Sequence, residues 1–317
     1  MINKEKYREF CKSEENMPIF SKDWWLDSVC GEDNWDVILY ERGGKIVASM
    51  PFYIKTKAIF TIITMPKLTQ NMGIYIKYPK GQKYYKRLSW EKELIKYCLN
   101  KLPSVDSFSQ NFYYSILNWL PFYWQGYSQT TRYTYVIGNI SIDELEKKFE
   151  TDIRRRRRKA SSIGIMVYES DDIKKFYEIN KKTFLRKNKD IPYSFEFIDN
   201  LYKNLKQRNI CKMYFAKDKD NSVIAVNFLV YDNSTVYYLM GGIEPSKRDL
   251  GGMDMILYES IKFALENGKF FDFEGSMIES IEKYFRSFGA EQRPYFNISK
   301  TNSKLLKTRS FIKELIK

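Results

Sequence analysis

The stretch from residue 223 to residue 300 constrains the fold more than any other part of this chain. It begins with two runs of β-branched and aromatic residues, 223–231 and 235–243, as expected for adjacent strands. A glycine-bearing turn, an amphipathic helix, a strand at 270–274 and a short helix that ends at Gly289 follow. This order of strands and helices predicts an α/β domain with a mixed sheet.

The turn between the second strand and the helix has a composition typical of a phosphate site. Arg248, Gly251 and Gly252 precede the helix, so several backbone N–H groups remain free at the positive end of the helix dipole. Glycines allow a pyrophosphate to approach the backbone closely. The Gly-x-Gly-x-x-Gly pattern of dinucleotide-binding domains is absent, so the sequence predicts an anion site of another kind.

The order of elements and this turn resemble the GNAT acyltransferase superfamily, in which Arg/Gln-x-x-Gly-x-Gly/Ala holds the pyrophosphate of acyl-CoA. Here Met253 stands at the third small position. The segments Phe271–Ser276 and Phe285–Gly289 are similar to motifs of the FemAB-like branch. Further matches lie upstream, at Arg154, Arg158, Lys159, Ala160, Thr183, Arg186 and Pro192. The resemblance implies two tandem GNAT-like domains and an acyltransferase activity.

Length and composition agree with two domains. The 317 residues are 44% hydrophobic and 17% aromatic, which is enough for two ordinary cores. Residues 35–53 are typical of a β-hairpin with the turn Arg42–Lys45, and the element order after it echoes the second half. We therefore expect an α/β protein with α+β mixed sheets in two tandem GNAT-like domains. Residues 1–140 form an N-terminal degenerate GNAT-like domain, and residues 141–317 form a C-terminal GNAT domain with the CoA-type turn.

Several classes of protein are excluded by what the sequence lacks. No apolar run approaches the roughly 18 to 20 residues of a membrane span, and residues 1–8 lack the apolar core of a signal peptide, so we expect a cytoplasmic protein. The four cysteines are widely spaced and predict neither disulfides nor a zinc site. Without histidine the usual general base and metal ligand are missing, and we expect no metal. Catalysis must then use carboxylates, Tyr, Lys, Arg or water.

The net charge of +14 indicates which binding partners are suitable and does not indicate the fold. Nucleic acid, an anionic membrane surface and phosphorylated small molecules all fit this charge. The most basic segment, Arg154–Lys159, lies in a helix predicted over 141–164, which begins with a capping box at Ser141 and Glu144. Successive arginines point all around a helix, so they cannot all bind one ligand. The run is either a solvated surface with salt bridges to acidic neighbours, or an anion site.

The second half supplies the candidate catalytic residues. Alternation along the strand sends Asp272 and Glu274 to one face, where either carboxylate could take a proton from an amine. Glu274 is ranked first because it is nearer the end of the strand, and a structural hydrogen bond is the alternative. By the resemblance, Arg286 matches the basic residue that reaches the reaction centre in FemAB-like enzymes. Tyr284 lies where some GNAT enzymes keep a Tyr that protonates the CoA thiolate.

Binding residues are predicted on the acceptor side and in the turn. The aromatic-rich segment 118–135 suits a cleft that stacks a sugar or peptide precursor, with core packing as the alternative. Ser276 is also expected to cap the helix that follows it. The acceptor is assigned to Trp124, Tyr127, Arg132, Arg186 and Ser276. Acetyl-CoA or another acyl-CoA is assigned to Lys247, Arg248, Leu250, Gly251, Gly252 and Met253.

Three functions remain open. The first, favoured by the turn, is an N-acyltransferase that moves an acyl group from acyl-CoA to an amine. Its acceptor would be a small or carrier-linked molecule, such as an amino sugar or a cell-envelope precursor. The second, favoured by the charge of +14, is a FemAB-type aminoacyl-tRNA-dependent peptidyltransferase. The third is a non-catalytic binding module on a GNAT scaffold. Peripheral contact with an anionic membrane is compatible with all three.

Overall fold

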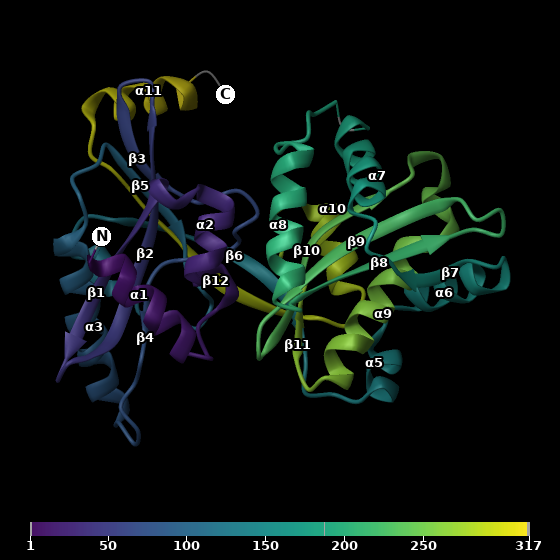
Figure 1. Ribbon diagram of the computed structural model, residues 1–317, viewed down its shortest axis with the longest axis horizontal. Coiled ribbons are helices and arrows are strands. Elements are labelled where there is room, and N and C mark those ends of the chain that lie inside the picture. The colour runs from purple at the N-terminus through teal and green to yellow at the C-terminus, as the bar shows by residue number, and fades with distance from the viewer. Residues whose placement is uncertain (1, 187, 316–317) are drawn as a thin grey trace. The chain divides into compact units, whose positions relative to one another are not determined.

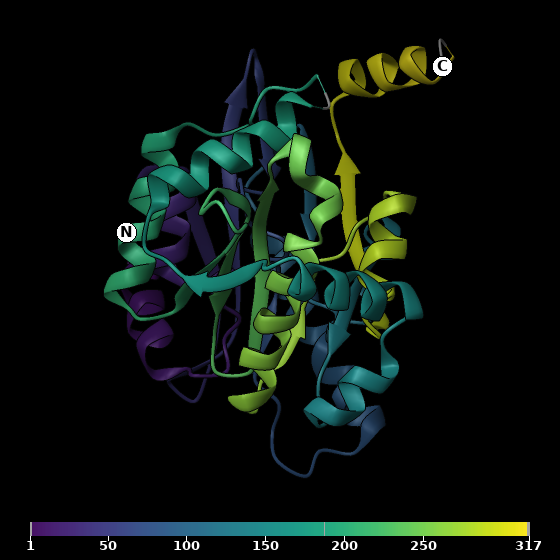
Figure 2. The same ribbon diagram turned by 90° about the vertical axis from the view of Figure 1, so that its right-hand side faces the viewer.

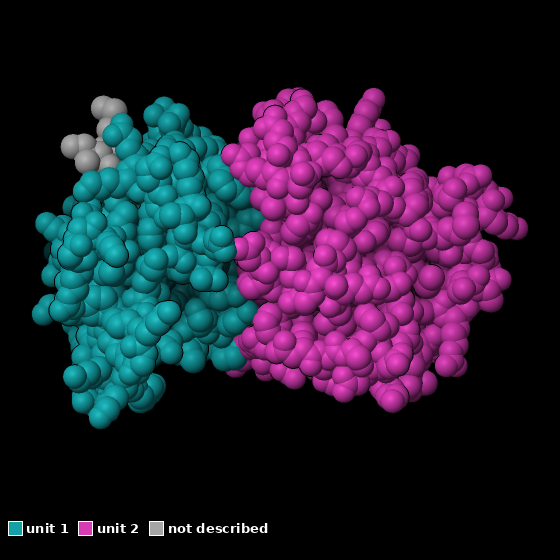
Figure 3. Space-filling view, turned by 60° about the horizontal axis from the view of Figure 1, so that its bottom comes forward, with its two compact units in different colours: residues 1–132, 294–317 teal, residues 133–293 magenta. Residues whose placement is uncertain are grey.

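The computed structural model describes residues 2–186 and 188–315, and the chain divides into two compact units. Unit 1 consists of Met1–Arg132 and Pro294–Lys317, and unit 2 consists of Tyr133–Arg293 (Figure 3). Each unit has its own hydrophobic core. Within the described residues no helix is long and apolar enough to cross a membrane.

Unit 1 is built on a sheet with the strand order β1-β2-β3-β5-β12, and β4 pairs with β2. β1 and β2 form the predicted hairpin, because Arg42 pairs with Lys45 and the two glycines between them have positive φ. α3 packs on one face of the sheet, while α1 and α2 cover the other (Figure 1). The strands are β1 (Trp35–Arg42), β2 (Lys45–Lys57), β3 (Phe60–Thr64), β4 (Tyr75–Ile76), β5 (Ser107–Asn111) and β12 (Glu291–Thr301). The helices are α1 (Ile2–Ser13), α2 (Asp23–Cys30), α3 (Tyr84–Lys101), α4 (Leu120–Tyr123) and α11 (Lys304–Leu315), with short 3-10 turns η1 (Ile19–Ser21) and η2 (Glu32–Asn34).

Unit 2 has the strand order β6-β11-β10-β9-β8-β7. α7 and α8 lie on one face of this sheet and α9 on the other (Figure 1). Side chains of α5, α6 and α10 join those of α9 in one core. The strands are β6 (Ser128–Ile137), β7 (Met166–Glu169), β8 (Cys211–Lys217), β9 (Val223–Tyr231), β10 (Thr235–Ile243) and β11 (Phe270–Asp272). The helices are α5 (Ile142–Lys148), α6 (Thr151–Ser162), α7 (Ile173–Leu185), α8 (Phe195–Gln207), α9 (Gly252–Glu266) and α10 (Glu279–Arg286), with the 3-10 helix η3 (Pro245–Leu250).

The two units repeat one topology. In unit 1 the antiparallel strands β1, β2 and β3 are followed by α3 and by β5, which is parallel to β3. In unit 2 the antiparallel strands β8, β9 and β10 are followed by α9 and by β11, which is parallel to β10. Two helices precede the meander each time. The predicted fold class, two tandem α/β units with mixed sheets, is confirmed.

Each sheet is completed by a strand from the other half of the sequence. β5 pairs with residues 297–301 of β12, whereas β11 pairs with Val136 and Ile137 of β6. The units therefore differ from the expected halves 1–140 and 141–317. Residues 133–140 belong to unit 2, and residues 294–317 belong to unit 1. Figure 2 shows β12 running on into α11 at this end of the chain.

Two predicted helix limits differ from the structure. The helix expected over 141–164 is broken into α5 and α6, because Phe149 takes an extended conformation and buries its ring at the break. The capping box of Ser141 and Glu144 is confirmed. Ser276 does not cap α10, which begins after Ile278; its hydroxyl instead accepts the Ile278 N–H at 3.0 Å.

We predict that unit 1 depends on residues 294–303. Deleting residues 294–317 removes the β12 partner of β5 and should lower the melting temperature by roughly 10 °C or more, since the buried Ile298 and the ladder bonds are lost. Deleting only residues 304–317 keeps β12 and serves as the control. Hydrogen exchange of the amides of residues 107–111 measures the effect directly. Equal protection of these amides in both deletions would contradict the pairing.

Candidate functional site

The site predicted on β11 lies where two parallel strands separate. β10 and β11 pair only over Thr235–Tyr237 and Phe270–Asp272. β11 ends at Asp272, whereas β10 continues to Ile243. The register of β10 with β9 shifts between Tyr238 and Met240. Side chains just beyond Asp272 therefore lie at the carboxyl end of the sheet, where α/β proteins commonly bind ligands.

Asp272 and Glu274 form a buried carboxylate pair. The side chains are only 4% and 6% exposed. Asp272 Oδ1 accepts the Glu274 N–H at 2.8 Å and the hydroxyl of Thr134 from β6. Phe271 and Phe273 lie in the core on the α9 side, and Asp272, the last residue of β11, faces the opposite side, as the strand period requires.

The backbone at Glu274 is in a conformation that side chains rarely adopt. Its φ is +63°, which costs roughly 1–2 kcal/mol for a residue other than glycine. Gly275 follows with φ +66°, and a Cβ there would lie 2.1 Å from the Tyr133 carbonyl oxygen. The close approach of β6 thus requires glycine at 275. Among the described residues, Glu274 Oε2 is buried and has no hydrogen-bond partner. Strain together with an unpartnered carboxyl oxygen is typical of a functional site.

Burial raises the pKa of both carboxyl groups. Desolvation raises the pKa of Asp272 to about 6, although the Thr134 hydroxyl and the Glu274 N–H favour its charged form. Desolvation also raises the pKa of Glu274 well above its ordinary value, and the negative charge of Asp272 raises it further. Carboxyl groups that titrate near neutrality are suited to general acid–base chemistry.

Tyr284 and the start of α9 belong to a second polar cluster. Asp254 in the first turn of α9 is 5% exposed. Its carboxylate accepts Arg156 Nε at 2.9 Å and the Tyr284 hydroxyl at 2.7 Å. Burial raises the pKa of Tyr284, and the Asp254 charge raises it further. The network ties α6, α9 and α10 together.

The predicted CoA turn is filled by protein atoms. Gly251 has φ +79°, and a Cβ there would lie 3.1 Å from the Cβ of Ala160 in α6. A Cβ at Gly252 would lie 2.8 Å from Ile224. Met253 Sδ lies 3.9 Å from the hydroxyl of Tyr238. The glycines thus allow helix α6 and the sheet to pack closely on the turn.

Helix α6 and an acidic side chain thus adjoin the turn predicted to hold the pyrophosphate of CoA. α6 lies against the turn that would have to hold it, and the first turn of α9 already holds a buried carboxylate, Asp254. Beyond the point where β10 and β11 part, Tyr238 packs against Phe285 with ring centroids 6.1 Å apart, and Phe273 stacks on Phe285 at 4.8 Å. Aromatic side chains therefore occupy the space between these strands on the α9 side.

The other predicted turn residues lie on η3. Lys247 forms an ion pair with Asp218, and Arg248 is exposed. Leu250 packs on the core of unit 2. A cavity of about 360 Å³ adjoins η3 and α7, and Lys175, Lys182 and Lys247 line it.

Arg286 lies on the other face of the sheet from the carboxylate pair. Its Nε donates to Glu282 Oε1 at 3.0 Å, and the same oxygen accepts the Tyr135 hydroxyl at 2.7 Å. Tyr135 points into the α9-side core, whereas the preceding residue, Thr134, bonds to Asp272. The structure therefore brings Asp272 and Glu274 together and leaves Arg286 apart from them.

The predicted acceptor residues are scattered. Tyr127 packs in the core of unit 1 against Phe108 at 5.4 Å, which is the core-packing alternative. Trp124 is 59% exposed beside α4. Arg132 and Arg186 are exposed, and Ser276 is half-buried in the segment after Glu274.

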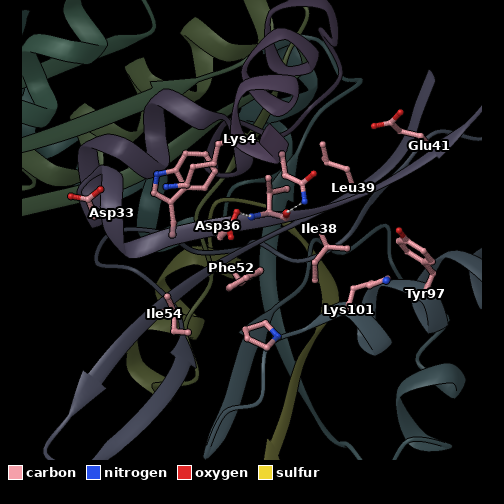
Figure 4. A pocket seen from close by; sticks show the side chains of 14 residues that line it. Lys4, Asp33, Asp36, Ile38, Leu39, Glu41, Phe52, Ile54, Tyr97 and Lys101 are labelled. Atoms are coloured by element: carbon pink, nitrogen blue, oxygen red, sulfur yellow. Dashed lines mark hydrogen bonds between the residues drawn. The ribbon is translucent and has the colours of Figure 1, made fainter. Parts of the chain in front are cut away.

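A cavity of about 820 Å³ lies along β1 in unit 1 (Figure 4). Its walls carry both charges, with Lys4 and Lys101 opposed by Asp33, Asp36 and Glu41. None of the predicted site residues lines it. Among the residues that the structure describes, no group of three or more His, Cys, Asp or Glu could hold a metal ion.

Thr134, Asp254 and Arg156 were not singled out by the sequence analysis. Asp254 could have been found as an acidic residue in the first turn of a helix, where it is favourable. Arg156 was hidden in a run of identical residues. Thr134 gives no local signal, because it is 138 residues away from Asp272 in the sequence.

We predict that the carboxylate pair lowers stability as the pH rises. Both pKa values are raised by folding, so the folded chain keeps protons that the unfolded chain releases. The stabilising contribution of Asp272 is complete below about pH 4 and is lost as the pH rises through about 6. Asp272→Asn should therefore raise the melting temperature at pH 8 by roughly 5 °C and leave it nearly unchanged at pH 4. Glu279→Gln, an exposed change, is the control; equal curves for Asp272→Asn and wild type would contradict the assignment.

Comparison with known proteins agrees with this architecture. Residues 147–285 match the family model of the acetyltransferase (GNAT) domain. No curated protein sequence matches the chain significantly. The structure of FemX is similar at 16% identity, with a TM-score of 0.67 over 93% of this chain and 96% of that one.

Two further structures share the fold. L-PGS from Bacillus licheniformis has 11% identity and a TM-score of 0.57, covering 98% of this chain and 96% of its own. A C-terminal domain from Agrobacterium fabrum, described as that of a lysylphosphatidylglycerol synthetase, has 10% identity and a TM-score of 0.56, covering 95% and 93%. Residues 147–285 thus match a GNAT acetyltransferase domain, and the chain shares the fold of FemX.

Proposed function

We propose that the protein is an N-acyltransferase in which Glu274 is the general base. The observation that carries this proposal is the buried pair of Asp272 and Glu274, with one carboxyl oxygen of Glu274 free of protein partners. An amine acceptor loses a proton when it forms an amide, and a carboxylate whose pKa is raised by burial holds that proton more readily than an ordinary carboxylate.

The chemistry follows from the geometry of the pair. The amine nitrogen of the acceptor attacks the carbonyl carbon of the donor, and Glu274 takes the proton that the nitrogen releases. The tetrahedral intermediate then collapses, the bond to the leaving group breaks, and the proton passes to the leaving oxygen or sulfur. Asp272 accepts a hydrogen bond from the Glu274 N–H. Its negative charge also makes proton uptake by the Glu274 carboxylate more favourable. Asp272 is thus a positioning residue.

We further propose that the donor is an aminoacyl-tRNA. GNAT domains use acyl-CoA, whose pyrophosphate needs free N–H groups at the start of the helix corresponding to α9. In this chain α6 packs on Gly251, and Asp254 and Tyr238 occupy the neighbouring space. The charge of +14 suits a polyanionic donor. Acyl-CoA remains the second candidate, because the exposed Arg248 adjoins the turn.

The acceptor that fits best is a carrier-linked amine of the cell envelope. Two of the similar structures are L-PGS and a domain of a lysylphosphatidylglycerol synthetase. The second name contains that of a lipid, lysylphosphatidylglycerol. The similarity to these two structures concerns the fold alone. It therefore does not favour a peptidoglycan precursor over an amino sugar as the acceptor. A cytoplasmic location fits a supply of charged tRNA.

The donor is tested by offering both candidates to the same protein. We expect no binding of CoA at millimolar concentration by calorimetry. We expect transfer of a radiolabelled amino acid from charged tRNA to at least one of two amine acceptors, a lysine-containing muramyl pentapeptide or glucosamine. Micromolar binding of acetyl-CoA would overturn the donor assignment. If neither donor is consumed with any acceptor, the non-catalytic binding module becomes the better account.

The base is tested by two substitutions and a matched control. Glu274→Gln should lower kcat about 100-fold or more, since a general base contributes roughly 10²–10⁴. Asp272→Asn should move the acidic limb of the pH–rate profile, which a merely structural role would not do. Arg286→Ala, on the other face of the sheet, is the control and should change kcat less than about threefold. A larger loss in Arg286→Ala than in Glu274→Gln would refute the assignment.

A further inference from the structure

We propose that a surface of unit 1 formed by α4 and the adjoining edge of α3 docks on an anionic lipid membrane. This surface, here called the α3–α4 surface, consists of Leu117, Leu120, Tyr123 and Trp124 together with Lys92 and Lys96. The proposal does not rest on the proposed function, because lipid binding can be measured without turnover.

The apolar side chains of the α3–α4 surface are exposed and gathered within eight residues of sequence. Leu117, Tyr123 and Trp124 are each 59% exposed, and Leu120 is 46% exposed. A large hydrophobic residue at such exposure is unremarkable when isolated, but a contiguous group marks an interaction site.

The fold holds these side chains outward. Phe122 is fully buried between Phe112 and Tyr127, with ring centroids at 5.0 and 6.0 Å, and so anchors the inner side of α4. Asn118 Nδ2 donates to Glu91 Oε2 at 3.0 Å and fixes the segment against α3. Pro121 and Phe122 are directed inward, whereas Leu120, Tyr123 and Trp124 are exposed to solvent.

The charge of the α3–α4 surface is positive. Lys92 lies beside α4, with its Nζ 5.2 Å from the centre of the Trp124 ring. Lys96 lies one helical turn farther along α3 and is exposed. Within the described part of the chain neither lysine has an acidic partner at ion-pair distance. The acidic residues of α3 are held elsewhere: Glu91 is buried with Tyr78 and Asn118, and Glu93 accepts the Tyr40 hydroxyl.

This combination fits a lipid surface better than nucleic acid. Trp and Tyr have an apolar body with a polar edge and are favoured at the boundary between head groups and acyl chains. Lysines beside them attract anionic head groups while their stems lie along apolar surface. Leu117 and Leu120 have no flat ring on which a base could stack, so half of the apolar group would contribute nothing to a tRNA site.

The experiment measures binding of the full chain to vesicles by co-sedimentation. Vesicles of equal parts phosphatidylcholine and phosphatidylglycerol are compared with vesicles of phosphatidylcholine alone. We expect binding to the anionic vesicles only, and at least about a tenfold loss in Lys92→Glu/Lys96→Glu. Tyr123→Ser/Trp124→Ser should lose binding to a similar extent. Circular dichroism and melting temperature show whether each variant is folded.

Matched controls place the same changes elsewhere. Ile59→Ser/Met166→Ser removes two apolar side chains that are 77% and 54% exposed, and Lys55→Glu/Lys57→Glu reverses two exposed charges at the end of β2. Both should bind like wild type. Brominated lipid should quench the fluorescence of the wild type more than that of Trp124→Phe, since that ring would enter the interface.

Three outcomes would overturn the proposal. The first is equal loss of binding in the controls, which would indicate a general charge effect. The second is wild-type binding in both α3–α4 surface variants. The third is that the surface variants bind vesicles normally but lose affinity for uncharged tRNA, in which case the surface is a nucleic-acid site.

Discussion

The pairing of β6 with β11 is the interaction on which the candidate site depends. It brings Thr134 to Asp272 and the Tyr133 carbonyl against Gly275. The first contact orients one carboxylate, and the second leaves room only for a glycine after Glu274. Both contacts flank Glu274, whose φ is +63°, and both come from a strand in a distant part of the sequence. A chain in which β6 paired differently would lose the geometry of the pair together with the core contacts of Tyr135 and Ile137.

The fold of unit 2 and the direction of Asp272 could be predicted from sequence, because both follow from local periodicity. Apolar runs, a turn and an amphipathic helix over residues 223–289 identify the elements, and alternation along β11 separates Asp272 from Phe271. The partner of the Asp272 carboxylate could not be predicted, since Thr134 lies in the other half of the sequence. The exchange of β6 and β12 between units hid the domain limits for the same reason.

The glycine turn illustrates a different limit of sequence reasoning. A glycine is needed wherever a neighbour approaches the backbone closely, whether that neighbour is a phosphate or a helix. Gly251 is approached by Ala160 of α6, and the motif alone does not distinguish the two cases. The arginine run is part of the answer, because two of its members turn inward. Arg156 pairs with Asp254, and Arg157 lies over the ring of Tyr258 at 3.4 Å and pairs with Glu146. These contacts hold α6 against the turn that contains Gly251.

The exchange of strands also orders events during synthesis of the chain. Most multidomain proteins fold one domain at a time as the ribosome releases them, with the N-terminal domain first. Here the edge of β5 has no partner until residues 297–301 have left the ribosome, by which time all of unit 2 has been made. An unpaired strand edge invites association with other chains. The nascent protein must therefore carry an open sheet edge through most of its translation, and shielding of that edge by a chaperone would matter more for this topology than for two domains joined in simple succession.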